Sequence, residues 1–191
     1  MNHERMDNEE LQYIALDAMN NGRHGEAVML LKTLLDREPE HANARYLLAA
    51  EHAQLGMFER AEQGLRAVLA VSPDFGMARF QLGQLLLMRD AGEEAVDALA
   101  SLAAGEDAMA AYARALCALA TDSEATAIRE LDAGLRLPQP VPTLAAEMQA
   151  LREKFAHSAR PALHPVESAQ APVGDAMPGA RMFIAGYGRG A

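Results

Sequence analysis

Apolar residues recur along this chain every three to four positions, and one set of them returns at a fixed interval of thirty-four residues. The set holds small and branched aliphatic side chains: Ala27, Leu31 and Leu34, then Ala61, Leu65 and Val68, then Ala95, Leu99 and Leu102. The short spacing predicts amphipathic helices. The longer one predicts stacked copies of one unit that is too small to bury its own apolar face. We therefore predict an all-α fold, an α-solenoid of stacked antiparallel helix pairs.

Each copy is predicted to consist of a helix, a turn and a second helix. In the first copy, Leu11 and Ala18 lie on one face of the first helix, and Asn21 and Gly22 end it, because Asn and Gly tolerate the left-handed backbone of a helix C-terminus. The second helix spans about 25–36 and packs back onto the first. Pro39 then prevents it from continuing.

Seven positions in each copy follow a recognisable order: a large residue, a Leu-Gly pair, an aromatic residue, Ala, a second aromatic residue and Pro. The first copy has Leu11, Ile14, Ala15, Ala18, Ala27, Leu31 and Pro39, and the second has Arg45, Leu48, Ala49, His52, Ala61, Leu65 and Pro73. The third has Arg79, Leu82, Gly83, Leu86, Ala95 and Leu99, with Asp107 in place of Pro. This order resembles the tetratricopeptide repeat, although most of the family's aromatic positions hold other residues here.

The repeat boundaries follow from this register. We expect a disordered segment at 1–7, repeats at 8–41, 42–75 and 76–109, a degenerate repeat at 110–139, a capping helix at 143–157 and a flexible tail at 158–191, the whole repeat domain covering 8–157. Ala127 follows Ala95 by thirty-two residues, which we interpret as a loop shortened by two. The capping helix is predicted to begin after Thr143 as N-cap and to direct Glu147 to solvent.

Composition and charge reduce the number of function classes that the sequence allows. The net charge of −10 argues against a nucleic-acid partner, and no run of residues is long and apolar enough for membrane insertion. The start of the sequence is acidic and lacks the features of a secretory signal, and Cys117 is the only cysteine, so we expect a cytoplasmic protein. The six histidines show no metal-ligand spacing, and Cys117 is interpreted as an inert thiol at the small-residue position of the fourth repeat. We therefore expect no cofactor, no metal and no enzymatic activity.

The resemblance implies a concave groove, lined by the second, fifth, ninth, twelfth and thirteenth residues of each repeat. Carried over, these positions give the predicted partner-binding residues Gln12, Leu16, Met19, Asn20, Tyr46, Ala50, Gln54, Met77, Phe80, Gln84, Leu87 and Met88. Most are apolar, and none is the cation with which the family's carboxylate-clamping groove holds a peptide terminus. Methionine adapts to partners of varied shape. The alternative is that neighbouring helices, a second copy or the protein's own tail cover these residues.

The tail carries a second candidate motif, an apolar stretch between arginines that consists of Arg181, Met182, Phe183, Ile184, Tyr187 and Arg189. Residues 158–191 carry a net charge of +1, which leaves −11 on the remainder. A basic, apolar end on an acidic body suits a binding peptide or an autoinhibitory segment, and a disordered end is the alternative.

The leading functional prediction is a non-enzymatic adaptor or chaperone that binds an apolar peptide segment of a partner protein in its groove. In size and groove the chain resembles the small bacterial tetratricopeptide chaperones of type III secretion. The alternative prediction is a structural module for assembly or homo-oligomer formation, whose tail docks into its own or a neighbour's groove.

Overall fold

The computed structural model describes residues 6–139 and 141–158, and this part of the chain is all α-helical. Its nine helices are α1 (Asn8–Asn20), α2 (His24–Arg37), α3 (Ala42–Gln54), α4 (Phe58–Val71), α5 (Gly76–Met88), α6 (Gly92–Ala103), α7 (Ala108–Ala120), α8 (Glu124–Leu135) and α9 (Pro142–Ser158). No strand occurs among these residues. The predicted all-α solenoid of helix pairs is confirmed.

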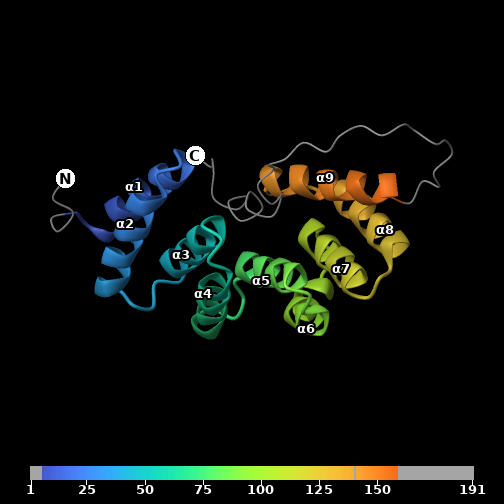
Figure 1. Ribbon diagram of the computed structural model, residues 1–191, viewed down its shortest axis with the longest axis horizontal. Helices are drawn as coiled ribbons and strands as arrows, with labels where there is room; N and C mark the ends of the chain where they lie inside the picture. The colour runs from blue at the N-terminus through green and yellow to red at the C-terminus, as the bar shows by residue number, and fades with distance from the viewer. Residues whose placement is uncertain (1–5, 140, 159–191) are drawn as a thin grey trace, which may run out of the picture.

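The helices form a curved row in which each packs against the next along the chain. In Figure 1, α3, α5 and α7 lie toward the concave side of this row, and α4 and α6 lie on its convex side. The first helix α5 also contacts the first helix α7 of the following pair. The first helices therefore build the inner side of the curve, and α9 continues it at the C-terminal end (Figure 1).

The spacing between the two helices of a pair is constant through all four pairs. The second helix begins sixteen residues after the first, for example at His24 after Asn8 and at Glu124 after Ala108. The connections that precede α3, α5 and α7 each have four residues. The missing two residues lie in α6, which has 12 residues where α2 and α4 have 14. The predicted loop deletion is therefore wrong, since a second helix is shortened instead.

This register also moves the fourth repeat. Because α7 begins at Ala108, its eighth residue is Ala115, which takes the position of Ala15, Ala49 and Gly83 in the first three pairs. Asp107 accepts a hydrogen bond from the Ala110 backbone N–H at 2.8 Å and so caps α7. Cys117 lies two residues beyond the small-residue position that the sequence assigned to it.

The turn inside each pair uses one left-handed residue. Gly22 and Gly56 have φ angles of +69° and +72°, as their predicted turn positions require. Asp90 and Asp122 occupy the same place in the third and fourth pairs, with φ angles of 60° and 54°. Short polar side chains tolerate this conformation better than other residues with a Cβ atom. The third and fourth pairs therefore keep the left-handed turn, although aspartate stands there in place of glycine.

The hydrophobic core runs the length of the row as two clusters that meet at α5. Leu31 and Ala27 are fully buried in the N-terminal cluster, and Leu99 and Leu131 are fully buried in the C-terminal one. The half-buried side chain of Met77 packs against both. The core is therefore continuous, and no pair buries its apolar face alone.

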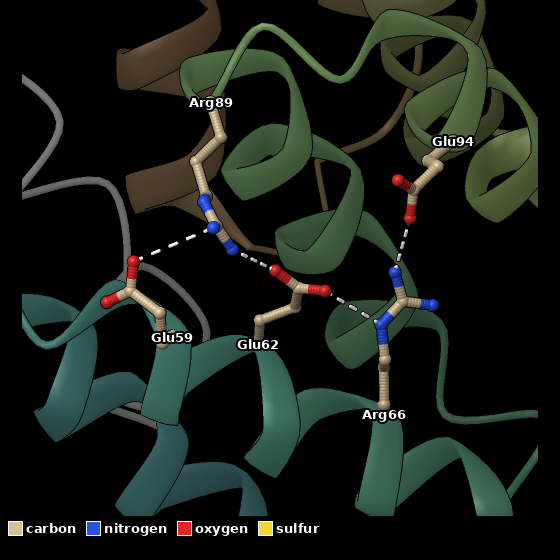
Figure 2. Close-up of polar contacts among 5 residues, drawn as sticks. All are labelled: Glu59, Glu62, Arg66, Arg89 and Glu94. Atoms are coloured by element: carbon tan, nitrogen blue, oxygen red, sulfur yellow. Dashed lines mark hydrogen bonds and ion pairs between the residues drawn. The ribbon is translucent and has the colours of Figure 1, made fainter.

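A network of ion pairs joins α4 to the next helix pair. The Arg66 guanidinium donates to Glu62 at 2.9 Å and to Glu94 at 2.7 Å, and Arg89 contacts Glu62 and Glu59 (Figure 2). These side chains come from α4, from the end of α5 and from α6, so the network joins neighbouring pairs at the surface. The individual pairs are partly exposed and each contributes little to stability.

The last helix differs from its prediction in two ways. It begins at Pro142, where proline suits the first helical position, so Thr143 lies in the first turn rather than before it. Leu144 and Met148 are buried against α8 as expected. The Glu147 side chain, however, is half-buried, its Oε2 atom has no hydrogen-bond partner among the described residues, and burial raises its pKa to about 8. The predicted solvent position of Glu147 is therefore wrong.

Candidate functional site

The predicted partner-binding residues all lie on the first helices α1, α3 and α5, of which Figure 1 shows α3 and α5 on the inner side of the curved row. Because these helices begin thirty-four residues apart, corresponding residues follow one another along that side. The fifth residues are Gln12, Tyr46 and Phe80. The fifth residue of α7 is Tyr112, so the aromatic series extends one helix further than the sequence predicted.

The burial of these twelve residues falls into three classes. Gln12, Leu16, Gln54, Met77 and Leu87 are half-buried, and Asn20 and Met88 are exposed. The buried members are Met19, Tyr46, Ala50, Phe80 and Gln84. Seven of the twelve therefore keep some exposure to solvent, while the buried five are inaccessible to a partner in this conformation.

The aromatic members of the series are held by specific contacts. The ring of Tyr46 lies 5.0 Å from that of Phe75, measured between centroids, with 31° between the ring planes. The Tyr112 hydroxyl donates a hydrogen bond of 2.8 Å to Oε1 of Gln139. Nε2 of Gln139 in turn donates to the backbone carbonyls of Gly134 and Leu137 at the end of α8. These contacts tie both rings to residues outside the first helices.

Two amide side chains among these inner-side residues have buried atoms that make no hydrogen bond. The Gln84 side chain is 2% exposed, and among the described residues neither its Nε2 nor its Oε1 atom has a hydrogen-bond partner. Nε2 of Gln54 on α3 is also buried without a partner in this part of the chain. A buried polar group that makes no hydrogen bond costs roughly 1–3 kcal/mol. Gln84 therefore carries a hydrogen-bonding capacity that residues 6–139 and 141–158 do not use.

The described residues do not meet the requirements of a metal site, a reactive thiol or a membrane-spanning helix. Within residues 6–139 and 141–158, no three His, Cys, Asp or Glu side chains are grouped so that they could hold a metal ion. The Cys117 thiol is half-buried, and burial raises its pKa, which disfavours the reactive thiolate.

The tail motif of Arg181, Met182, Phe183, Ile184, Tyr187 and Arg189 lies outside the described residues. None of the helices that the structure describes has the length and apolar content needed to cross a membrane.

The repeated helix pairs, their constant spacing and their shared core define a helical repeat protein. Two family models, both described as tetratricopeptide repeat, match residues 18–74 and 47–108. The chain is a tetratricopeptide repeat protein, as its pattern of small and apolar residues indicated. This fold is in general a module for protein–protein interaction rather than catalysis, with a concave surface for the partner.

Solved structures share the architecture at low sequence identity. A thermophilic tetratricopeptide repeat protein of Thermus thermophilus is 18% identical with a TM-score of 0.63, and the match covers 80% of this chain and 82% of that one. A MamA structure from Desulfovibrio magneticus is 21% identical with a TM-score of 0.59, covering 80% of this chain and 96% of the other. At these identities the likeness concerns the fold alone. A comparison with curated protein sequences found no match.

Proposed function

We propose that this protein is a non-enzymatic adaptor or chaperone that holds an apolar peptide segment of a partner protein along its inner side. The apolar character of that side supports the proposal. Met77 is half-buried and Met88 is 38% exposed, and methionine side chains repack against partners of different shape. Such a surface suits a chaperone or adaptor that accepts varied apolar sequences.

The observation that carries the proposal is the unpaired amide of Gln84. Its Nε2 donor and Oε1 acceptor are both buried on α5 without a partner among the described residues. A peptide bond offers one donor and one acceptor, so an extended peptide that crosses α5 would satisfy both atoms if the side chain turned outward. Binding would then recover free energy that the free protein forgoes.

A selection experiment tests this function with the full chain. Apolar twelve-residue peptides are selected from a displayed library on the immobilised protein, and their affinities are measured by fluorescence anisotropy. The variant Gln84→Leu keeps the volume of the side chain and removes both polar atoms. We expect it to bind the selected peptides at least tenfold more weakly and to unfold at higher urea concentration than the wild type. The matched control is Gln149→Leu, at an exposed position of α9, which should change neither property.

Equal affinity of the selected peptides for wild type and Gln84→Leu would refute a role of this amide in peptide binding. Failure to select any peptide would contradict the function as a whole. If, in addition, light scattering shows an oligomer that dissociates when residues 159–191 are removed, the structural assembly module becomes the better account of the protein.

A further inference from the structure

A second surface feature lies away from the inner-side residues, between α2, α3 and α4. It is a cavity of about 480 Å³, lined by Lys32, Arg45, His52 and Arg60 together with the aliphatic residues Leu35 and Leu48. Among the described residues, no carboxylate lines the cavity, and it shares no residue with the partner-binding set on the inner side. A concentration of cations is unexpected on a chain that carries a net charge of −10.

The cations of this cavity have no carboxylate partners in the part of the chain that the structure describes. Nε of Arg45 donates to the backbone carbonyl of Pro39 at 2.6 Å, and Nη1 of Arg60 has only a weak contact of 3.9 Å with Sδ of Met57. Lys32 is exposed and makes no ion pair with any residue that the structure describes. Five other arginines each pair with at least one carboxylate, namely Arg23, Arg66, Arg89, Arg114 and Arg152, whereas Arg79, Arg129 and Arg136 also have no carboxylate partner among the described residues but do not line the cavity.

The next helix pair provides an internal comparison for the charges. Thirty-four residues after Lys32 and Arg60 stand Arg66 and Glu94, and these two form an ion pair of 2.7 Å (Figure 2). Glu62, the second partner of Arg66, corresponds to Val28. In the later repeat, the cation Arg66 is therefore neutralised by Glu94. At the equivalent positions of the cavity, Lys32 and Arg60 are both cations, and no described carboxylate pairs with them.

The internal comparison also separates His52 from its equivalent in the next repeat. The residue that corresponds to His52 is Leu86, whose side chain is buried in the core at 2% exposure. His52 is instead half-buried and lines the cavity. Its pKa is lowered by burial and by the charges of Arg60 and Lys32, so both cations act on the imidazole ring. The cavity therefore differs from the next repeat at two positions, with a polar ring in place of a core leucine and a cation in place of an acid.

We propose that this cavity is a second binding site, which takes a carboxylate side chain of an acidic peptide segment from a partner protein between Lys32, Arg45 and Arg60. The aliphatic side chains of Leu35 and Leu48 in the lining accommodate the methylene groups of a glutamate. The cavity volume of about 480 Å³ suits several side-chain atoms with the adjoining backbone rather than a single small anion. The negative charge of the rest of the chain repels anions elsewhere, so the affinity must come from these local cations.

The test uses the full chain and three probes: an acetylated and amidated hexaglutamate, the corresponding hexaglutamine, and inorganic phosphate. Binding is measured by calorimetry at low ionic strength and located by nuclear magnetic resonance. We expect hexaglutamate alone to bind measurably, to raise the pKa of His52 as a carboxylate enters, and to lose affinity with added salt. The changes in nuclear magnetic resonance chemical shift should concentrate on the residues of α3 and α4 around the cavity.

Two variants separate binding from folding. Arg60→Glu installs the residue of the next repeat, and we expect hexaglutamate affinity to fall at least tenfold, or by about 1.4 kcal/mol, while the protein stays folded. His52→Leu installs the residue of the next repeat, removes the imidazole nitrogens from the cavity lining and should also weaken binding. The matched control is Arg129→Glu on the exposed surface of α8, which makes the same change of charge away from the cavity and should leave affinity unchanged.

Three results would overturn the proposal: no binding of hexaglutamate, an equal loss of affinity in Arg60→Glu and Arg129→Glu, or phosphate binding at least as tightly as the peptide. The last result would identify a site for small anions instead. None of these outcomes depends on Gln84 or on apolar peptides, so this site and the proposed inner-side function are tested separately.

Discussion

A close approach between α3 and α4 gives a sharp test of the packing of this protein. A Cβ atom added to Gly64 of α4 would lie 2.7 Å from the Cβ and 3.4 Å from the Cα of Ala49 on α3. Neither atom can move by rotation of a side chain, so Gly64→Ala must push the two helices apart. The usual gain from replacing a helical Gly with Ala is about 1 kcal/mol. Overpacking at such a contact costs about 1–3 kcal/mol.

We therefore expect Gly64→Ala to leave the free energy of unfolding unchanged or up to about 2 kcal/mol lower, despite its better helix propensity. The third repeat shows how the contact can be relieved, since Gly83 and Ala98 stand there in place of Ala49 and Gly64. The double variant Ala49→Gly and Gly64→Ala should accordingly recover stability, with a coupling energy of about 1–3 kcal/mol.

Urea denaturation followed by circular dichroism measures all the variants, and Gly25→Ala is the control. Gly25 lies in α2 with open space around its missing Cβ, so alanine should stabilise the protein there. If Gly64→Ala stabilises as much as Gly25→Ala, or if the two changes at positions 49 and 64 are additive within about 0.5 kcal/mol, the reasoning about helix contact is wrong.

Three further predictions concern buried polar groups. Because the pKa of Glu147 is raised from 4.5 to about 8, the folded state retains a proton that the unfolded state has lost, so the free energy of unfolding should fall as pH rises across that interval. Glu147→Gln should remove this part of the slope in urea titrations at successive pH values, and an unchanged slope would exclude Glu147 as its source. Tyr112→Phe loses the hydrogen bond to Gln139 and should cost about 1 kcal/mol in the same assay, whereas Tyr13→Phe at an exposed position should cost nothing. His24→Ala removes the 2.8 Å partner of the fully buried Glu51 carboxylate and should lower stability by about 1–3 kcal/mol, and a second change, Glu51→Gln, should restore part of it.

The architecture was predictable because its main determinants are local and repeated. Ala27, Ala61 and Ala95 are all fully buried in the structure, as are Leu31 and Leu99. Small residues at a helix crossing and leucines one turn later leave a periodic signal that a single sequence reveals. The all-α class and the family could therefore be predicted from the sequence and are confirmed.

The predicted start of the fourth repeat at residue 110 is wrong, because it rests on the alanine of the second helix, and α7 begins at Ala108. The interval between Ala95 and Ala127 shows that two residues are missing, but it does not show where. The useful signal was Asp107, an N-cap residue directly before the apolar run of α7. This N-cap and the sixteen-residue spacing inside each pair together place the start of α7 at residue 108, which makes Tyr112 its fifth residue, equivalent to Tyr46 and Phe80.

The exposure of individual site residues could not be predicted from helical periodicity. Neighbouring positions on one helix face directions about 100° apart, so a small rotation decides whether a side chain meets the next helix or the inner side. Tyr46 and Phe80 were expected on an open surface and are buried, whereas Leu16 and Met88 at related positions keep some exposure. Which of these occurs depends on how adjacent helix pairs pack, and that information is tertiary.

Internal repeats allow one last prediction, because the same exchange of charge can be made at two equivalent positions. Arg60→Glu would place an acid beside Lys32, and Glu94→Arg would remove the acid beside Arg66. Both sites are exposed enough that each effect should be small, about 0.2–1 kcal/mol, but the signs should be opposite: the first variant becomes more stable and the second less. Thermal unfolding at low ionic strength measures both, and added salt at molar concentration should reduce both differences. If the two variants shift stability in the same direction, the cations of the cavity are not uncompensated. If the signs are opposite and only Arg60→Glu loses hexaglutamate binding, repulsion between unpaired cations in the free protein is linked directly to recognition of an acidic ligand.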